Sequence, residues 1–462
     1  MTDRLSLGDF LEKELLDETC DLLSRLIQNK CVNPPGDEIK SIKTISDHLK
    51  KYGIEAKIYE SNPSRGNLVA KISGSDKNHP GLIFGPSHVD VVPVTKPEEW
   101  QVDPFSGELK DNHIWGRGAF DMLFMVATQV QAFIQLKKEG FQPKGDLILF
   151  IVADEETGGK FGAKWMLDNH PEEVGLYNKE MFAVTESGGI PFAPNRMIFL
   201  HGEKGSMWTC LKFKGTPGHG SYPYGSDNAI LKSSEAALKL TDYCDNKMPV
   251  DTQYIRNLIK GVGINFILRK LITNKFTLPY MLKILKKTDP QMATVMHSLT
   301  RMTISPNVIK GGSKTNIIPA EVLLNLDVRT LPGQDFEYVK FHIRRALGSL
   351  ADEVEINQLL EEGFFVEGTV SPPESLFVDA MNEAVQKEFP DSKLVPMLSM
   401  GGTDARFYRM KNVEAYGFAL YDPELKLGEI FSMSHGIDEK IGLKTIDLSL
   451  KVFYNLAKGF LV

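Results

Sequence analysis

The sequence predicts an α/β protein in which a layered main domain is interrupted by a smaller α+β segment. Seven apolar residues from Leu147 to Ala153 form a run that is too short for a helix and lies between Gly145 and Asp154. Such a run indicates a strand that is buried on both faces of a sheet. Helical and strand-like periods alternate on both sides of it, and that order is typical of layered α/β domains.

The main domain is expected to start with two helices and to continue with alternating strands and helices. Apolar residues recur at helical spacing in two stretches that the loop CVNPPGDE separates. The expected elements are helices over 9–29 and 39–52, strands over 55–59, 67–72 and 82–84, a helix over about 122–139, a strand over 147–153, a helix over about 161–169 and a strand over 181–185.

A second pattern starts near Ser206 and is typical of a β-α-β-β-α-β unit. Its expected elements are strands over 206–214, 321–328 and 354–359 and helices over 230–240 and 336–347. Residues 249–306 are rich in Lys, Leu, Ile and Met, which predicts extra helices, and we interpret their apolar stripe as packing. A helix over 374–389, a strand and a helix over 444–460 then return to the first pattern. We therefore predict a main domain made of 1–205 and 361–462 and an inserted domain over 206–360.

Composition narrows the class of protein. The chain has 462 residues, of which 42% are hydrophobic and 24% charged, and its net charge is −7. No basic run or basic-aromatic stripe stands out, so nucleic acid is not an expected partner. No run approaches the roughly 18 apolar residues of a membrane helix, so no membrane partner is expected either. Four cysteines without CxxC spacing and an N-terminus with scattered acids indicate a cytoplasmic protein with reduced thiols.

Three acidic residues, Asp154, Glu155 and Glu156, follow the central apolar run. Ligand sites in open α/β sheets lie beyond the carboxyl ends of strands, and adjacent carboxylates there repel each other unless a proton or a metal ion offsets the charge. The alternative is a solvated acidic turn, because acids are common in turns. The motif alone leaves both interpretations open.

His88 follows the strand-like run GLIFGPS, and Asp90 comes two residues later. A histidine ligand needs an acceptor for its second ring nitrogen, and a nearby carboxylate is the usual one. HVD could therefore supply a metal ligand and the residue that orients it, although a histidine that is merely hydrogen-bonded would look the same. Asp121 stands after GRGAF at the start of an expected helix, where an acid is equally explained as a cap.

The order of the candidates is more informative than any one of them. Zinc and similar ions are held by imidazole nitrogen and carboxylate oxygen, and paired sites use a bridging carboxylate. Residues of these types fall at loop starts of the predicted main domain and not in the inserted domain. They are His88, Asp121, Glu155 with Glu156, Glu186 in TESGG and His435 in SMSHGIDE.

Nine stretches from about residue 80 to residue 440 carry a family resemblance. They read SHVDVVP, WQVDPFSGELKDNHIWGRGAFDM, DEETGG, TESGG, GTPGHGSYP, TNIIPAE, DVRTLPG, GGTDAR and SHGIDE. The sequence resembles the aminoacylase and carboxypeptidase family of zinc amidohydrolases, which includes succinyl-diaminopimelate desuccinylase, acetylornithine deacetylase and carboxypeptidase S. The tract FILRKLITNKFTLPYMLKIL is similar to the branch of carboxypeptidase S and the secreted N-acyl-amino-acid hydrolases.

The resemblance implies a three-layer catalytic domain of the zinc-exopeptidase type with an inserted ferredoxin-like lid or dimerisation domain. It also implies two divalent cations, expected to be zinc, with cobalt and manganese as alternatives. His88 would bind one ion and His435 the other, and Asp121 would bridge them. Glu156 would complete the shell of one ion and Glu186 that of the other.

The resemblance further implies a general base, Glu155, and an orienting residue for His88, Asp90. The residues agree with this division: of two adjacent acids, one can point at a cation and ionise easily, while the other keeps a pKa suited to accepting a proton from water. The base would then hand this proton to the leaving nitrogen of an amide.

Other implied residues concern the substrate. His219 in GTPGHGS would donate to the oxyanion, often across from a partner subunit's lid, although a surface histidine in a glycine-rich turn is the alternative. Asn316 and Arg329 would hold a free carboxylate, and Arg329 could instead form a structural ion pair. Gly402 and Thr403 resemble the loop that lines the substrate pocket.

One departure from the family pattern stands beside the bridging aspartate. The family has Met-Lys-Gly-Gly after this residue, whereas the chain has Met122, Leu123, Phe124 and Met125. The loss of the lysine removes a charge near the metal loop but no ligand.

The sequence therefore predicts a metal-dependent amidohydrolase. Its substrate would be an N-acyl amino acid or a short peptide with a free carboxylate, and a homodimer through the lid is an expected assembly. The alternatives are a dipeptidase or carboxypeptidase proper, a non-catalytic scaffold that retains the fold, for which Leu123 is the only support, and a metal-dependent phosphoesterase.

Overall fold

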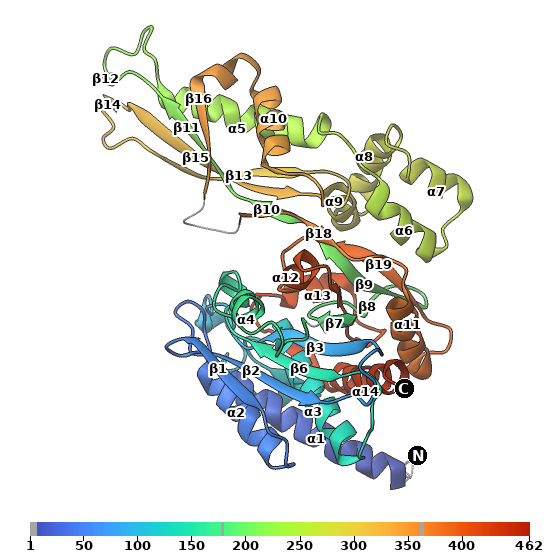
Figure 1. Cartoon of the computed structure of the whole chain (residues 1–462). Helices are drawn as coiled ribbons and strands as arrows, with labels where there is room; N and C mark the ends of the chain where they lie inside the picture. Colours follow the sequence, from blue (N-terminus) through green and yellow to red (C-terminus); the bar gives the residue numbers. More distant parts are fainter. Residues whose placement is uncertain (1–6, 177–179, 360–364) are drawn as a thin grey trace. The chain divides into compact units, whose positions relative to one another are not determined.

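The computed structural model describes residues 7–176, 180–359 and 365–462, which form two compact units (Figure 1). Unit 1 consists of Met1–His201, Ser371–Pro396 and Thr403–Val462, and unit 2 of Gly202–Val370 and Met397–Gly402. The chain passes from unit 1 to unit 2 within one continuous strand, β9 (Arg196–Glu203), so no loop marks this change. The predicted boundary at 205 lies just beyond that strand, and the predicted boundary at 360 lies outside the described residues. Both boundaries stay predictions.

The sheet of unit 1 is mixed, with four parallel strands at its centre. Strand order is β1-β2-β6-β3-β7-β20-β9. Strands β6, β3, β7 and β20 are parallel to one another, and β1, β2 and β9 pair antiparallel at the two sides. The bounds are β1 Lys57–Asn62, β2 Arg65–Ile72, β3 Gly81–His88, β6 Leu147–Val152, β7 Met181–Thr185 and β20 Glu414–Gly417.

Helices cover both faces of this sheet (Figure 1). Strand β6 shows why: Leu147, Leu149 and Ile151 belong to one hydrophobic cluster, and Ile148 and Phe150 belong to another. Alternate residues of a strand point to opposite faces, so a strand that is apolar throughout requires cover on both sides. The predicted three-layer α/β class is confirmed. The first cluster includes α1 Leu7–Gln28, α2 Ile39–Lys50, α3 Phe124–Lys138, α11 Leu376–Glu388 and α14 Leu443–Phe460, and the second includes α4 Ala163–Asn169 and α12 Ala405–Met410.

Helix α3 is the central helix of the first cluster. Among the described helices, the stretch Ala119–Lys138 is the one long and apolar enough to cross a membrane, and 89% of its most apolar window is buried inside the protein. It therefore has the burial of a core helix.

Unit 2 contains the predicted β-α-β-β-α-β order. The order β16-β11-β15-β13 places four antiparallel strands in one sheet, and α5 and α10 share its hydrophobic cluster. The elements in chain order are β11 Thr209–Lys214, α5 Ala229–Asn246, β13 Thr303–Gly311, β15 Glu321–Thr330, α10 Phe336–Leu347 and β16 Val354–Gln358, with β10 Gly205–Met207 beside β15. Four helices lie in the tract predicted to be helical, α6 Gln253–Val262, α7 Phe266–Ile272, α8 Leu278–Thr288 and α9 Pro290–Ser298.

Strand β13 is a difference from the sequence prediction, which extended the helical tract to Pro306. The strand begins at Thr303, and most of its residues are exposed. An exposed strand has no alternation of apolar and polar residues, so the pattern could not reveal it.

Candidate metal centre

Three neighbouring parallel strands bring the predicted ligands to one edge of the sheet in unit 1. Strand β3 ends at His88, β6 is followed by Glu155 and Glu156, and β7 is followed by Glu186. Because β6, β3 and β7 are adjacent and parallel, their carboxyl ends lie side by side. The last ligands come from elsewhere: Asp121 precedes α3, and His435 follows α13 (Leu427–Met433).

The carboxylate of Asp121 lies between two imidazoles. His88 Nε2 is 3.4 Å from Asp121 Oδ1, and His435 Nε2 is 3.4 Å from Asp121 Oδ2. A glutamate completes each side: Glu186 Oε2 is 3.7 Å from His88 Nε2, and Glu156 Oε1 is 3.3 Å from His435 Nε2. The structure thus forms two groups of three side chains that could each hold a metal ion, and Asp121 belongs to both.

The side chains in the cluster fit two divalent cations. His88 Nε2, Glu156 Oε1 and Glu186 Oε1 are buried, and none makes a hydrogen bond to the described residues. Buried polar atoms almost always have a partner, so three such atoms within the two groups fit the binding of cations. Each group offers one imidazole nitrogen and two carboxylate oxygens, a donor set that suits zinc and related ions.

The pKa values of the clustered side chains also indicate that positive charge would stabilise the cluster. Burial raises the pKa of Glu156, and it raises the pKa of Glu186 to about 7. The nearby carboxylates of Asp121 and Glu156 raise the pKa of His435 to about 10. In the absence of metal, the cluster therefore favours protons on its glutamates and on His435, and a divalent cation can replace these protons.

Glu155 lies beside the cluster but is not one of the grouped ligands. Burial and the neighbouring Glu186 carboxylate raise the pKa of Glu155 well above that of an ordinary glutamate. A carboxyl group with a raised pKa next to a metal site can accept and return a proton near neutral pH. This environment suits the role of general base.

Asp90 connects the His88 strand to the acidic turn. His88 Nδ1 lies 3.0 Å from the backbone oxygen of Asp90 and 3.5 Å from its carboxylate. The Asp90 carboxylate also accepts hydrogen bonds from the backbone N–H groups of Glu155 and Glu156, at 3.2 and 3.1 Å. The predicted orienting residue therefore also holds the turn that carries the predicted general base and one predicted ligand.

Behind Asp90 lies a buried polar network that the sequence analysis missed. Asn33 Nδ2 donates to Asp90 Oδ2 over 2.8 Å and to Asp154 Oδ1 over 3.2 Å. Arg65 Nη2 lies 2.6 Å from Asp154 Oδ1, and Arg65 Nε lies 2.8 Å from Glu38 Oε2. Asp154, the first acid of the DEE motif, therefore supports the turn rather than facing the cluster.

A second support holds Asp121. Glu439 Oε1 accepts hydrogen bonds from the backbone N–H groups of Phe120 and Asp121, at 2.9 and 3.0 Å. Arg117 donates to Glu439 Oε2 over 2.6 Å and to the backbone oxygen of His435 over 3.2 Å. This pair therefore ties the loop of the shared aspartate to the loop of His435. Glu439 is the last residue of the SHGIDE stretch, of which only His435 was predicted to belong to the site.

Another buried acid near the cluster is Asp404, in the GGTDAR stretch. Both of its carboxylate oxygens are buried without a hydrogen bond to the described residues, and Arg406 Nη2 is 3.7 Å from Oδ1. Burial raises the pKa of Asp404 to about 8. Gly402 and Thr403 were the residues predicted from this stretch, but Asp404 has the more unusual environment.

The sequence was then compared with known proteins. Residues 86–459 match the model of "Peptidase family M20/M25/M40". The chain belongs to this family. It is therefore a metal-dependent hydrolase of amide or peptide bonds. The predicted family and the predicted class of reaction are both confirmed.

Curated relatives and a solved structure agree with this assignment. "Probable carboxypeptidase S-like 2" of Dictyostelium discoideum is 26% identical over 405 residues, which cover 85% of this chain and 74% of that protein. "N-fatty-acyl-amino acid synthase/hydrolase PM20D1" of Xenopus tropicalis is 27% identical over 402 residues, covering 84% and 74%. The M20 family metallo-carboxypeptidase Sso-CP2 from Sulfolobus solfataricus superposes with a TM-score of 0.71 at 18% identity, covering 96% of this chain and 99% of that chain.

The M20 resemblance also assigned roles to residues of unit 2. His219 and Asn316 lie close together: His219 in β12 (Gly218–His219) pairs with Ile317 in β14 (Ile317–Ile318), and Gly220 N donates to Asn316 O over 2.8 Å. The His219 ring is exposed, and its Nδ1 lies 2.7 Å from Ser221 Oγ. The roles of these two residues stay predictions.

Arg329 forms the intramolecular ion pair that the sequence left open as an alternative. Its Nε lies 2.7 Å from Asp327 Oδ1, and its Nη2 lies 3.3 Å from Oδ2. Gly402 is the last residue of the short segment that belongs to unit 2, and Thr403 begins the return to unit 1. The substrate-binding roles of all three residues stay predictions.

Leu123, which departs from the M20 pattern, is buried in the first hydrophobic cluster of unit 1. The side chain that replaces the family lysine therefore adds apolar packing under the Asp121 loop and leaves both groups of ligands intact.

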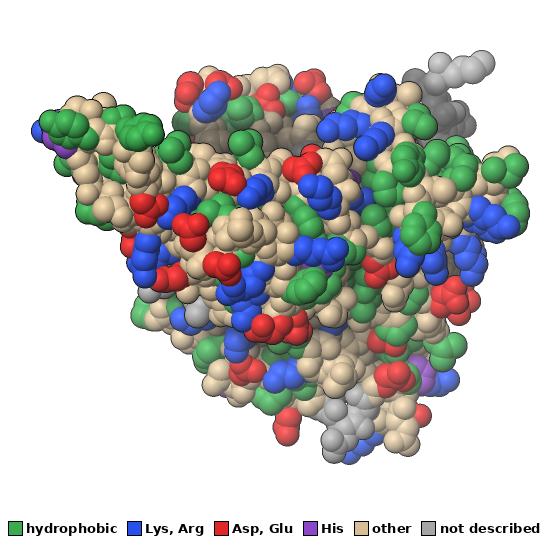
Figure 2. All heavy atoms as spheres, turned by 90° about the horizontal axis from the view of Figure 1, so that it is seen from above, with side chains coloured by type: hydrophobic (Ala, Val, Ile, Leu, Met, Phe, Trp, Pro, Cys, Tyr) green, Lys and Arg blue, Asp and Glu red, His purple; other side chains and the backbone are tan. Residues whose placement is uncertain are grey.

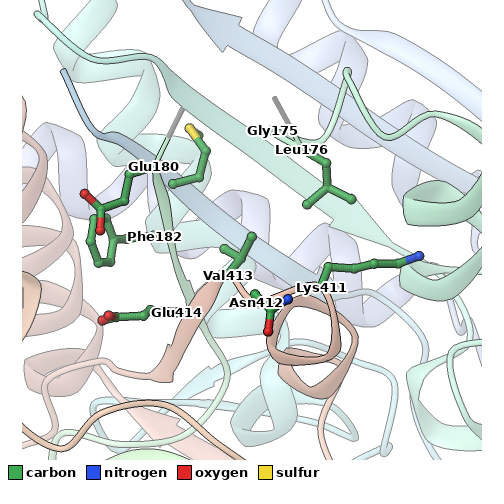
Figure 3. A pocket seen from close by; sticks show the side chains of 9 residues that line it. Gly175, Leu176, Glu180, Phe182, Lys411, Asn412, Val413 and Glu414 are labelled. Carbon is green, nitrogen blue, oxygen red and sulfur yellow. The ribbon is translucent and has the colours of Figure 1, made fainter. Parts of the chain in front are cut away.

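A cavity of about 380 Å³ lies at the other end of the same sheet (Figure 3). It is lined by residues at the amino ends of β7 and β20, among them Glu180, Phe182, Lys411 and Glu414. Because Glu186 follows the carboxyl end of β7, strand β7 separates this cavity from the metal centre. The cavity is therefore not part of the candidate metal centre of this M20 protein.

Proposed function

We propose that the protein hydrolyses the amide bond of N-acyl amino acids or short peptides that carry a free carboxylate. The observation that carries the proposal is the sharing of Asp121 by two groups of metal-binding side chains next to Glu155. The name of the relative that acts on N-fatty-acyl amino acids supports the choice of an N-acyl amino acid. We further propose a cytoplasmic location, because the spacing of the four cysteines does not form a disulfide framework.

We propose that His88, Asp121 and Glu186 hold one zinc ion and that Asp121, Glu156 and His435 hold the other. When bound, the two cations would supply Lewis-acid polarisation of the scissile carbonyl and would make a water acidic enough to attack near neutral pH. Asp121 would keep the ions at a fixed separation because each of its oxygens faces a different histidine.

Glu155 would move the proton. Its carboxylate would accept a proton from the attacking water and donate it to the leaving nitrogen, so the amine departs neutral. Asp90 would hold Glu155 in place through the backbone N–H group of that residue, and it would fix the ring of His88 through Nδ1. Two loops are thus positioned by one carboxylate.

We propose that residues of unit 2 recognise the substrate. His219 would donate to the oxyanion, from the lid of the same chain or of the other copy in a dimer. Asn316, which directly precedes the strand that pairs with the His219 strand, would donate to the free carboxylate together with Arg329. Arg329 would have to exchange or share its Asp327 partner, so we expect its contribution to be smaller than that of Asn316. Gly402 and Thr403 would line the pocket.

The experiment is a screen of the zinc-loaded protein against N-acyl amino acids and dipeptides, with release of the free amine as the readout. We expect N-acyl amino acids to be cleaved and the same substrates with an esterified carboxylate to be cleaved at least about tenfold more slowly, because a charged hydrogen bond is lost. A preference for dipeptides would favour a dipeptidase or carboxypeptidase proper. Turnover of phosphate esters, or zinc binding without any turnover, would overturn the proposal in favour of a phosphoesterase or a scaffold.

A further inference from the structure

The helical tract of unit 2 carries large apolar side chains that are exposed to solvent. They lie on α7, on α8 and in the turn between these helices, and we call them the insert face. The insert face consists of Phe266, 57% exposed, Ile267, 68%, Leu268, 39%, Phe276, 72%, Tyr280, 72%, and Ile284, 60%. Exposed apolar residues that gather in one patch, rather than singly, mark an interaction surface.

Helix α8 shows that this exposure has a direction. Leu278 and Leu282 are buried on one side of the helix, while Tyr280 and Ile284 are exposed. The buried pair and the exposed pair are each four residues apart, so each pair lies along one side of the helix. The helix is therefore attached to the protein through one apolar side and presents a second apolar side to solvent.

Basic side chains surround the insert face. From Gly263 to Thr288 the chain has six basic residues, Arg269, Lys270, Lys275, Lys283, Lys286 and Lys287, and no acidic residue. The whole chain has 53 basic and 60 acidic residues, so the rest of it has 47 and 60, a net charge of −13. Positive charge is therefore concentrated on this segment. The six residues are spread over two helices and a turn, so they do not form a continuous basic run in the sequence.

The charges and the apolar rings are in contact. Lys270 Nζ lies 4.5 Å from the centre of the Phe266 ring, and Lys275 Nζ lies 5.2 Å from that of Phe276. Figure 2 shows hydrophobic and basic side chains together over this segment. A surface that pairs exposed aromatic and aliphatic side chains with lysines matches the boundary between lipid headgroups and acyl chains.

We propose that the insert face docks on the surface of a lipid bilayer that contains anionic lipids. The apolar side chains would enter the boundary between headgroups and acyl chains, and the six basic side chains would pair with lipid phosphates and carboxylates. A second copy of the chain is the less suitable occupant, because self-association through this face would bring two sets of six positive charges together. The expectation of no membrane partner rested on the lack of a spanning run, and interfacial docking needs none.

The test is co-sedimentation of the full-length, zinc-loaded protein with vesicles. One set is pure phosphatidylcholine, and the other contains about one third phosphatidylserine. We expect binding to the anionic vesicles at 0.1 M salt and at least about tenfold weaker binding to the neutral vesicles, because each basic residue adds electrostatic attraction to an anionic surface. Binding should be lost as the salt concentration rises, because salt screens this attraction.

Two variants separate the apolar part from the charged part. Phe276→Ser with Tyr280→Ser removes apolar area, and Lys283→Glu with Lys287→Glu reverses two charges; each should weaken binding to anionic vesicles at least about tenfold. Leu109→Ser, which changes an exposed leucine of unit 1, is the control and should bind as the unchanged protein does. Thermal unfolding of each variant checks that it folds.

Three results would overturn the proposal. The first is no binding of the unchanged protein to anionic vesicles. The second is the same binding in the control and in both folded double variants. The third is a dimer in sedimentation analysis that either double variant abolishes while vesicle binding is unaffected, which would make the insert face an interface between copies.

Discussion

Asn33 donates a hydrogen bond from Nδ2 to Oδ2 of Asp90 over 2.8 Å, and both side chains are buried behind the metal cluster. The Asp90 carboxylate in turn holds the backbone of Glu155 and Glu156 and lies against the ring of His88. One amide group thus stabilises the residue that positions the predicted general base and two predicted ligands, although its own hydrogen bonds go to Asp90, Asp154 and Thr157.

Replacement of Asn33 should therefore weaken metal binding. We expect Asn33→Ala to raise the dissociation constant for zinc about 10- to 100-fold, which is typical for the loss of a partner outside the ligand shell. Zinc competition with a chromophoric chelator measures this change. Asn246→Ala, which removes an exposed asparagine from α5, is the control and should leave zinc affinity unchanged. An equal affinity in Asn33→Ala and in the control would contradict the positioning role of Asn33.

Arg65 is expected to matter for stability. Its guanidinium is buried between Glu38 and Asp154, so Arg65→Met would leave two buried carboxylates without their cation. We expect the free energy of unfolding to fall by about 3–5 kcal/mol, the usual effect of removing one partner of a buried ion pair. Urea unfolding measures it. Lys57→Met breaks the exposed pair with Glu173 and should cost less than about 1 kcal/mol. Similar losses in both variants would show that burial does not decide the effect.

His201 should make the stability of unit 1 depend on pH. The ring is buried, its Nδ1 lies 3.0 Å from Ser371 O, and burial lowers the pKa of His201 to about 4 from an ordinary value of 6.5. Between these values the unfolded chain binds a proton that the folded chain does not, so stability is fully present above pH 6.5 and is lost as pH falls towards 4. The loss is on the order of 3 kcal/mol.

Urea unfolding of the metal-free protein from pH 4 to pH 7 tests this expectation. His201→Gln should show a shallower dependence on pH, because the buried imidazole is gone, whereas Asn246→Ala, which removes no titratable group, should keep the slope of the unchanged protein. The same slope in all three proteins would mean that His201 is not the source.

Glu155 and Glu156 are adjacent in sequence, but we expect their replacement by glutamine to have different effects. Glu155→Gln should keep both zinc ions and lose about 10²- to 10⁴-fold in turnover, because it removes a proton acceptor and no ligand. Glu156→Gln should lose one zinc ion per chain, because its side chain belongs to the group of His435. Metal analysis together with single-turnover rates separates the two outcomes. Retained turnover in Glu155→Gln would remove it from the mechanism.

The sequence predicted the parts of the site that depend on local order. Three apolar runs form neighbouring parallel strands, and each is followed by one of the candidates His88, Glu155 with Glu156, or Glu186. Their proximity could be predicted because ligand sites lie at the carboxyl ends of parallel strands. The buried run Leu147–Ala153 likewise predicted cover on both faces. These inferences need no knowledge of side-chain contacts.

The supporting residues could not be predicted in the same way. Asn33 lies 57 residues from Asp90, and Arg65 lies 89 residues from Asp154, so these contacts exist only once the domain is folded. Strand β13 could not be predicted for a different reason. Most of its side chains are exposed, so its sequence lacks the alternation of apolar and polar residues that a half-buried strand shows.

The central claim is that two cations share Asp121, and the number of zinc ions per chain tests it most directly. After saturation with zinc and removal of excess metal, we expect two ions per chain in the unchanged protein, one in His435→Ala, and a larger loss in Asp121→Ala than in His435→Ala, since Asp121 alone belongs to both groups. A count of one or none in the unchanged protein, or a count of two that Asp121→Ala leaves intact, would contradict the shared centre.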